Sequence, residues 1–379
     1  MDQDRPHSRD YDQERDRRED RDREHDRHHD LRDHEARDSR NFGDDRDARH
    51  ARDAHDFRER ERDPSSYARR THDDTRNRDR PYGPPPPAAA DDRARAVALH
   101  YNARPQATVV TRQDSPIYQL RCFNNWVKAV LFQTYLRRND RVLDMGCGKG
   151  GDLQKYRQAD IRELYAFDVA DKSIDQATER YQTMRNARFR AQFRAVDCYN
   201  TSIEPHLPRD QGFDVVSMQF CMHYAFSSEQ QVRQMLANVT ARLRPGGFFI
   251  GTCPNANTIV RKLRHADGLE FGNSIYTVKF TQKDECPVYG HEYSFRLVDA
   301  VDDCPEYLVH WPSFVKLARE YRLDPIAHQG FHLFYTQHID RHRDLFVRMK
   351  VVTPDSPTLP ADQWEAAGLY SIFAFQKTD

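Results

Sequence analysis

The sequence predicts an α/β fold with a mostly parallel sheet and helices on both of its faces. From about residue 95 onwards, strand-like and helix-like segments alternate along the chain. A glycine-rich turn at residues 146–151 joins the first strand-like segment to a helix-like one. Because parallel neighbouring strands need crossover helices between them, this alternation favours a sheet that is covered on both sides.

Residues 1–95 differ from the rest of the chain. They consist almost entirely of Asp, Arg, His and Glu, with hardly an aliphatic residue. Such a segment cannot bury enough apolar surface to offset its ordering entropy, so we expect it to be disordered. Gly83-Pro-Pro-Pro-Pro87 is expected to be a stiff linker into the folded domain, residues 96–379. Two interpretations of the tail stay open: a docking or RNA-contacting arm, and a solvated spacer.

The first half of the folded domain alternates regularly between the two kinds of element. Ile117, Leu120, Phe123 and Val127 recur at helical spacing, which predicts a helix over 116–136. Short apolar or alternating runs then predict strands, and amphipathic runs predict helices. In chain order these are a strand at 141–145, a helix start at 152–157, a strand at 164–169, a helix at 171–184, and strands at 187–196 and 213–220.

The second half begins with a helix and ends with a strand. A Ser-Ser-Glu-Gln sequence offers an N-cap for a helix over 227–243, and Pro245-Gly246-Gly247 predicts a turn into a strand at 248–253. Aromatic residues are frequent over 270–310, where we expect a β-rich insertion. The remaining predictions are a helix at 311–321 and strands at 323–335 and 370–376.

Composition excludes several classes of protein. The seven cysteines are scattered without a Cys-x-x-Cys pair, so we expect neither a disulfide framework nor a metal site. The start of the chain lacks the apolar stretch of a signal peptide, and no run approaches the ~18 apolar residues of a membrane span. We therefore expect no membrane association and a location in the cytoplasm or nucleus. The formal net charge of −1 averages over dissimilar regions and indicates no partner.

The glycine-rich turn lies within Val142-Leu-Asp-Met-Gly-Cys-Gly-Lys-Gly-Gly151. Glycine lets the backbone approach a ligand closely, and the following helix offers free N–H groups to a carboxylate or phosphate. Gly146, Gly148 and Gly150 alternate, unlike the Gly-x-Gly-x-x-Gly spacing of nicotinamide-binding loops. Taken alone, this loop fits a structural turn equally well.

Two acidic residues end the next two predicted strands. Asp168, twenty positions after Gly148, is placed to reach a ribose diol, and Asp197 to accept from an adenine amino group. Either residue could instead cap a helix, but together they favour adenosylmethionine. The Asp-x-Gly-x-Gly form of the loop resembles motif I of class I methyltransferases. That resemblance implies a Rossmann-like sheet of seven strands.

Many separated segments closely resemble the eukaryotic mRNA cap (guanine-N7) methyltransferases, over about residues 96–378. The matching segments are 98–102, 112–117, 120–128, 148–153, 168–171, 219–224, 271–276, 293–295, 304–309 and 364–370. The resemblance implies an mRNA cap 0 methyltransferase domain that methylates N7 of the 5′ guanosine cap with S-adenosyl-L-methionine. It also implies a nuclear monomer whose partner is the capped 5′ end of mRNA. The tail lies outside the resemblance, and capping or transcription machinery is a candidate partner for it.

The same resemblance implies roles for individual residues. The expected adenosylmethionine contacts are Lys128, Gly146, Asp168, Asp197, Gln219 and Tyr224. The expected cap contacts are Asn124, Asn125, Lys149, Lys155, Arg180, His223, Glu306 and Tyr370. Cations suit the methionine carboxylate and the cap phosphates, whereas a carboxylate can accept from guanine N1–H and N2–H₂. Each position also has an ordinary structural explanation, such as a polar helix face, a helix cap or a buried aromatic.

We expect no residue to act as an acid or base. Guanine N7 has a lone pair and no proton, so in-line displacement by proximity and alignment suffices. His223 and Tyr224 are accordingly expected to position the substrates. Two alternatives remain: a methyltransferase for a small molecule or another RNA position, and a non-catalytic RNA-binding scaffold.

Overall fold

The computed structural model describes residues 97–100, 102–103, 113–209 and 212–379. The predicted disordered tail and the Pro-rich linker lie outside these residues.

Seven strands form the central sheet. They are β1 (Arg141–Met145), β2 (Glu163–Asp168), β3 (Arg190–Ala195), β4 (Phe213–Gln219), β5 (Leu243–Pro254), β10 (Leu323–Gly330) and β11 (Tyr370–Lys377). Their order in the sheet is β10-β11-β5-β4-β1-β2-β3. Strands β1 to β5 pair in parallel, whereas β11 is antiparallel to both β5 and β10. The predicted seven-stranded, mostly parallel sheet is confirmed.

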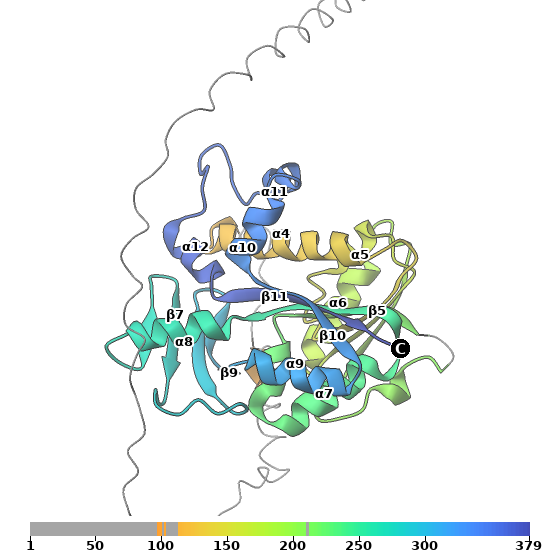
Figure 1. The fold of residues 1–379 in the computed structure, drawn as a ribbon. Helices are drawn as coiled ribbons and strands as arrows, with labels where there is room; N and C mark the ends of the chain where they lie inside the picture. The colour runs from red at the N-terminus through yellow and green to blue at the C-terminus, as the bar shows by residue number, and fades with distance from the viewer. Residues whose placement is uncertain (1–96, 101, 104–112, 210–211) are drawn as a thin grey trace, which may run out of the picture. The chain divides into compact units, whose positions relative to one another are not determined.

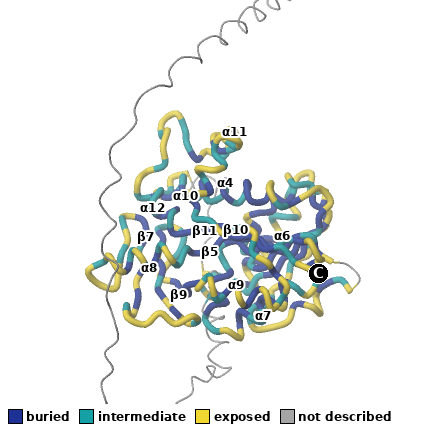
Figure 2. The backbone as a smooth tube through the Cα atoms, in the orientation of Figure 1, coloured by how far each residue is buried: buried dark blue, intermediate teal, exposed yellow. Residues whose placement is uncertain are grey.

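Alternate residues of the strands point to opposite faces and enter two hydrophobic cores. Val142 joins the first core with Phe123, whereas its neighbour Leu143 joins the second core with Leu236. The first core includes residues of α4 (Tyr118–Tyr135), α5 (Leu153–Gln158), α10 (Phe331–His338), α11 (Arg343–Arg348) and α12 (Ala361–Ala367). The second includes residues of α7 (Glu229–Ala241) and α9 (Trp311–Glu320). Figure 1 shows α4 above β5 and β11, with α7 and α9 below them. In Figure 2 the backbone between these layers is largely buried.

A second, smaller sheet follows α8 (Ala256–His265) in the chain. Its strands are β6 (Glu270–Gly272), β7 (Tyr276–Phe280), β8 (Glu292–Leu297) and β9 (Val301–Tyr307). All neighbours in it are antiparallel, in the order β6-β7-β8-β9. Val278 and Phe295 enter the first core, so this small sheet packs against the main domain. The predicted β-rich insertion is confirmed.

The strand predicted over 323–335 is wrong in its second half. β10 ends where Gly330 pairs with Ser371, and α10 starts at Phe331. Phe331 and Phe334 are both buried, at the i, i+3 spacing of a helix. The pattern of a short aromatic run is compatible with a strand or with a helix. Here the helix forms because it buries Phe331 and Phe334 on the same face.

Other boundaries shifted by a few residues. β5 starts at Leu243 because the Pro245–Gly247 turn lies inside the strand, where the register against β4 shifts and Gly246 has φ +74°. α7 starts after Ser228, whose side chain accepts from the Gln231 N–H, so the predicted N-cap is confirmed. Helices α8, α11 and α12 were not predicted. α6 (Asp171–Gln182) matches its prediction to within two residues.

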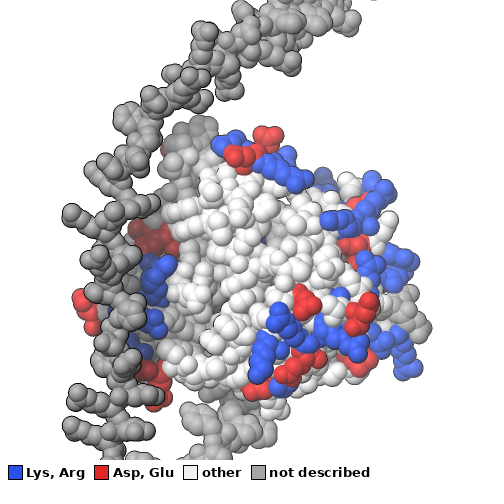
Figure 3. All heavy atoms as spheres, in the orientation of Figure 1, with Lys and Arg blue, Asp and Glu red and all other residues white. Residues whose placement is uncertain are grey.

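Charged side chains are unevenly distributed. Figure 3 shows few of them in the middle of the face in view, and Lys and Arg gathered along its right-hand rim. Among the residues that the structure describes, no helix is both long and apolar enough to cross a membrane.

Candidate functional site

A cavity of about 1670 Å³ lies at the carboxyl ends of the central parallel strands. β1 has β4 on one side and β2 on the other, so the strand order reverses at β1. The connections then leave the sheet in opposite directions and open a crevice at this point. The cavity is lined by residues of α4, of the glycine loop, of the segments after β2, β3 and β4, and of the small sheet.

The glycine loop is fixed to the end of β2 by its backbone. The N–H groups of Gly146 and Cys147 donate to the Phe167 carbonyl at 2.7 and 3.0 Å. Gly146 has φ +83°, and a Cβ there would lie 2.5 Å from Cys221 Sγ. Only glycine meets both conditions, so this position is determined by conformation and by close packing.

Asp168 also holds the loop in place. The Gly148 N–H donates to its Oδ2 at 2.8 Å, and the Ala170 N–H donates to its Oδ1 at 2.9 Å. Burial raises the pKa of Asp168, and these backbone donors oppose the rise. A Cβ at Gly148 would meet no atom within 4 Å. The loop therefore presents its backbone to the open cavity.

An ionic network joins α4 to the loop. Lys128 Nζ lies 2.8 Å from Asp152 Oδ1, and Lys155 Nζ lies 2.8 Å from the same oxygen. Lys155 Nζ also donates to Asn125 Oδ1 at 2.9 Å. Burial by itself would raise the pKa of Asp152, but the two ammonium groups outweigh it and hold that pKa well below its usual range. Asp152 thus fixes both lysines.

A second acid lies at the end of β1. Asp144 is only 4% exposed. Burial, with the nearby charge of Asp152 as the next cause, raises the pKa of Asp144 to about 8. Beneath the loop the structure thus holds one acid that resists ionisation and one that is ionised.

The predicted adenine and methyl ends of the site are built from strand ends. Asp197 accepts from the backbone N–H groups of Tyr199 (2.9 Å) and Asn200 (3.2 Å), so it closes the turn after β3. Gln219 Nε2 donates to Ser217 Oγ at 3.1 Å, which fixes this amide at the end of β4. The ring centroids of Tyr224 and His223 lie 4.3 Å apart.

The predicted guanine-binding residues meet in a buried cluster. The Tyr293 hydroxyl donates to Glu306 Oε2 at 2.7 Å, and His223 Nε2 lies 3.4 Å from Glu306 Oε1. His223 is 2% exposed and Glu306 is 5% exposed. The Tyr370 ring packs edge-on against Phe220, with centroids 5.0 Å apart. Strands β8, β9 and β11 and the segment after β4 therefore contribute these side chains.

The structure brings most of the predicted site residues to one cavity. All six predicted adenosylmethionine positions line it: Lys128, Gly146, Asp168, Asp197, Gln219 and Tyr224. Four of the predicted cap positions also line it: Asn124, Asn125, Lys149 and Arg180. The other four, Lys155, His223, Glu306 and Tyr370, are buried next to lining residues. Their individual roles stay predictions.

One lining residue points to a missing hydrogen-bond donor. Asn124 Oδ1 is buried and has no hydrogen-bond partner among the described residues. A buried carbonyl without a partner is costly, and a donor on a bound molecule would satisfy it. Within the described parts of the chain, no three His, Cys, Asp or Glu side chains are grouped as a metal would need.

Three residues of the site were missed in the sequence. Asp152 directly follows the glycine loop, and this position in the sequence could have indicated an acid that pairs with a lysine of the site. Tyr293 lies in one of the matching segments but was given no role. Phe220 has φ +60°, and its backbone N–H donates to Thr252 Oγ1 at 3.0 Å. No local sequence signal predicts that conformation.

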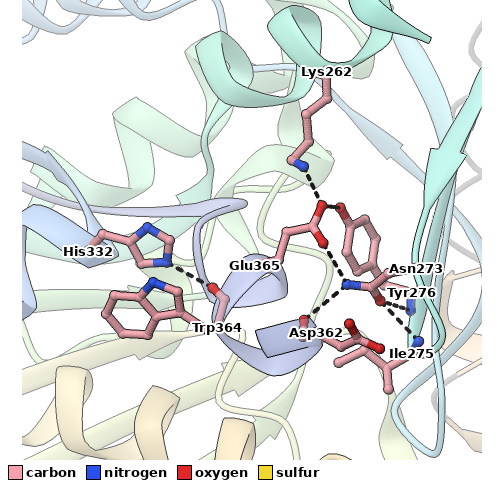
Figure 4. Close-up of polar contacts among 8 residues, drawn as sticks. All are labelled: Lys262, Asn273, Ile275, Tyr276, His332, Asp362, Trp364 and Glu365. Carbon is pink, nitrogen blue, oxygen red and sulfur yellow. Dashed lines mark hydrogen bonds and ion pairs between the residues drawn. The ribbon is translucent and has the colours of Figure 1, made fainter. Parts of the chain in front are cut away.

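Glu365 joins the small sheet to the helix that precedes β11. Its carboxylate accepts from Lys262 of α8, from the Tyr276 hydroxyl at 3.0 Å and from Asn273 Nδ2 at 3.0 Å (Figure 4). Asn273 Nδ2 also donates to the Asp362 carbonyl at 3.1 Å. These contacts, here named the Glu365 clamp, connect α8 and the β6–β7 turn to α12.

The other side of α12 is held by α10. The His332 ring stacks on Trp364 with centroids 4.0 Å apart, and its Nε2 lies 2.8 Å from the Trp364 carbonyl (Figure 4). α12 is followed at once by β11, whose first residue is Tyr370. The position of this predicted cap residue thus depends on helix contacts far from it in sequence.

Several known proteins are similar in sequence to this chain over most of its length. The family model described as the mRNA (guanine-N(7))-methyltransferase domain matches residues 88–378. The mRNA cap guanine-N(7) methyltransferase of Cryptococcus neoformans (strain JEC21) is 44% identical over 308 residues, which is 78% of this chain and 50% of that protein. The chain thus spans only half the length of this relative.

Two further relatives are matched over more of their own length. The mRNA cap guanine-N(7) methyltransferase of Schizosaccharomyces pombe is 45% identical over 294 residues, covering 74% of this chain and 81% of that protein. The mRNA cap guanine-N(7) methyltransferase 1 of Oryza sativa subsp. japonica is 41% identical over 301 residues, covering 75% and 81%.

Proposed function

Because the chain belongs to the mRNA (guanine-N(7))-methyltransferase family, we propose that it transfers a methyl group from S-adenosyl-L-methionine to N7 of the 5′ guanosine cap of mRNA. The observation that supports this most is the shared cavity. Residues expected to hold the cofactor and residues expected to hold the cap line the same space. A methyl group moves directly from donor to acceptor only when both are bound together.

The cofactor would be held by the carboxyl ends of the strands. Asp168 and Asp197 would accept from the ribose and the adenine, and Gly146 would allow the close backbone approach. Lys128 would attract the methionine carboxylate, although it already pairs with Asp152. The family resemblance supplies these roles, and the cavity lining is compatible with them.

The cap would be held by α4, the loop and the small sheet. Asn124 and Asn125 would flank the nucleoside, and Lys149 and Arg180 would attract the phosphates. Glu306 and Tyr370 would select and pack against the guanine. Lys155 would act indirectly in this arrangement, because its ammonium group holds Asn125 and Asp152.

The reaction needs no proton transfer at N7. S-adenosyl-L-methionine supplies an electrophilic methyl group, and the chain's residues would align N7 with it and exclude water. His223 is buried and is not part of the cavity lining, which agrees with a positioning role. If His223→Gln abolished turnover while cap and cofactor binding stayed intact, a general-base role would replace this one.

The test is a labelled methyl assay followed by nucleoside digestion. Capped RNA should yield N7-methylguanosine, whereas uncapped RNA and small metabolites should not be methylated. Label on a metabolite or on another RNA position would favour the alternative methyltransferase activities. Absence of adenosylmethionine binding by calorimetry would favour the non-catalytic scaffold.

We also propose that the protein is a nuclear monomer whose tail contacts capping or transcription machinery. The family resemblance supports the location, because cap methylation serves mRNA. Imaging of fluorescent fusions of the full chain and of residues 96–379 tests it, and light scattering gives the mass in solution. A cytoplasmic full-length fusion, or a dimer mass, would contradict the respective proposal.

A further inference from the structure

One part of the domain has an excess of cations over anions. Residues 180–196 contain no Asp or Glu and five arginines: Arg180, Arg185, Arg188, Arg190 and Arg194. The stretch runs from the end of α6 through a turn and along β3. It is here called the basic rim.

The fold makes little use of these charges. Arg185, Arg188 and Arg194 are exposed, and none forms an ion pair with another described residue. Arg190 is also exposed, and its Nη2 lies 3.5 Å from Glu163 Oε1. Exposed guanidinium groups without an acidic partner contribute little to the stability of the fold.

Some exposed arginines in other parts of the described chain have an acidic partner, whereas others, such as Arg261 and Arg264, form no ion pair with a described residue. Examples of paired arginines are Arg138 with Asp160 at 3.0 Å and Arg244 with Asp214 at 2.6 Å. What sets the basic rim apart is that its five arginines lie within one short stretch that contains no Asp or Glu, so positive charge accumulates there and favours an anionic ligand.

The basic rim is continuous with the cavity. Arg180 lines the cavity, and so does Val196, two residues after Arg194. Among the described residues, β3 is the outermost strand on its side of the sheet, so no further strand pairs with its free edge. Arg188 and Arg194 are separated by about 20 Å of extended chain at roughly 3.3 Å per residue. A long ligand leaving the cavity could follow this edge.

We propose that the basic rim binds the phosphate backbone of the RNA that follows the cap. The inference rests on capped RNA as the substrate, since only a polyanion that extends beyond the triphosphate needs such a surface. Arginine pairs well with phosphate oxygens. The neighbouring aromatic rings point inward: Phe189 is buried, and the Phe193 ring packs 5.8 Å from that of Tyr181. Without exposed rings for base stacking, binding is independent of RNA sequence.

The test compares two substrates in the full-length protein. Arg188→Ala/Arg194→Ala should raise KM for a capped oligonucleotide roughly three- to tenfold. KM and kcat for the cap dinucleotide GpppA should stay unchanged, because this substrate has no RNA body. A plot of log K for oligonucleotide binding against log salt concentration has a negative slope. The magnitude of this slope should fall by about 1.4, because each of the two lost phosphate contacts contributes about 0.7.

The control removes the same charge elsewhere. Lys316 and Arg319 are exposed on α9, which packs on β10 at the opposite edge of the sheet. Lys316→Ala/Arg319→Ala should leave KM for both substrates and the salt dependence unchanged. An equal effect of the two double variants would show only a non-specific loss of charge and would overturn the proposal.

Other outcomes also decide the question. An unchanged KM for the capped oligonucleotide would show that RNA leaves by another route. Loss of GpppA methylation in the rim variant would assign the arginines to the cap site or to folding. Binding of a phosphorylated peptide, but not of RNA, to the wild-type rim would replace RNA by a protein partner. If wild-type protein failed to methylate GpppA at all, the proposed function would fail, while oligonucleotide binding by fluorescence anisotropy would still test the rim.

Discussion

Four ionisable side chains lie within the wall behind the glycine loop, where burial disfavours the charged form of each acid and each lysine. Lys128 and Lys155 share Asp152, which stays ionised because two cations face it. Asp144 has a neighbour of its own sign, and its charged form is disfavoured. The difference between two acids so close together arises from their partners and not from their residue type.

Asp144 should make the fold less stable as pH rises. The pKa of Asp144 is about 8 in the folded state, against about 3.9 in an unfolded chain. Between these values the folded state holds a proton that the unfolded state has lost, so stability falls with increasing pH. Asp144→Asn keeps a neutral side chain, and its Tm should decline less from pH 5 to pH 8 than that of the wild type.

A suitable control for this measurement is Asp175→Asn, because Asp175 is exposed on α6. Its Tm should follow the wild-type pH dependence. Parallel Tm curves for the wild type and Asp144→Asn would contradict the raised pKa of Asp144.

Glu306 should determine guanine selection. Its Oε2 accepts a hydrogen bond from the Tyr293 hydroxyl, which orients the carboxylate, and its Oε1 lies 3.4 Å from His223 Nε2. Glu306→Ala should reduce discrimination between guanosine and adenosine caps by roughly tenfold or more, because buried polar readout of a base contributes about 1–3 kcal/mol. Competition between the two caps in the methyl assay measures this ratio, and an unchanged ratio would rule out the assignment.

At the scale of elements, the small sheet and α12 act as one unit. The Glu365 clamp joins α8, the β6–β7 turn and α12, and β11 with Tyr370 follows. The small sheet also holds Tyr293 and Glu306. Residues on separate elements can select one base only if these elements keep a fixed distance.

Glu365→Gln should therefore weaken cap binding more than cofactor binding. The substitution removes the charge that attracts Lys262 while keeping the shape of the side chain. KM for the cap should rise several-fold, and the Kd for adenosylmethionine should stay within about twofold of the wild type. Calorimetry and steady-state kinetics measure the two quantities.

Glu320→Gln is the matched control for the clamp, since Glu320 pairs with Arg233 in an exposed ion pair at 2.7 Å. This change should affect neither constant. A Glu365→Gln variant that lost affinity for both ligands equally would show a general loss of stability instead of a clamp for the cap site.

At the scale of the whole molecule, we predict a boundary near residue 95 between the tail and the domain that carries the proposed activity. The family model starts at residue 88 and ends at residue 378, which leaves residues 1–87, most of the Arg/Asp-rich tail and the linker, outside it. Residues 96–379 alone should keep the Tm of the full chain and its kcat on GpppA. A truncated protein that aggregates, or that loses activity on GpppA, would place the boundary within the tail.

Much of the fold could be predicted because the signals were local. Asp168 and Asp197 were placed correctly at strand ends, since the strands before them have clear apolar patterns. The aromatic run after Gly330 was misplaced because the same residues fit either element, and only burial of Phe331 and Phe334 against the first core selects a helix. The match to the mRNA cap guanine-N7 methyltransferase family, inferred from separated motifs, is confirmed.

The sequence by itself determined the α/β class and the glycine loop, because both depend on spacing along the chain. Its separated motifs indicated the family, and the resemblance to that family supplied the candidate site residues. Only the tertiary structure decided which of those residues line the cavity. Lys155 is the clearest example: the family resemblance suggested a phosphate contact, and the structure shows this lysine buried between Asn125 and Asp152. Residues far apart in sequence come into contact only when packed helices and strands fix their positions. A local sequence pattern contains no information about the distance between them in space.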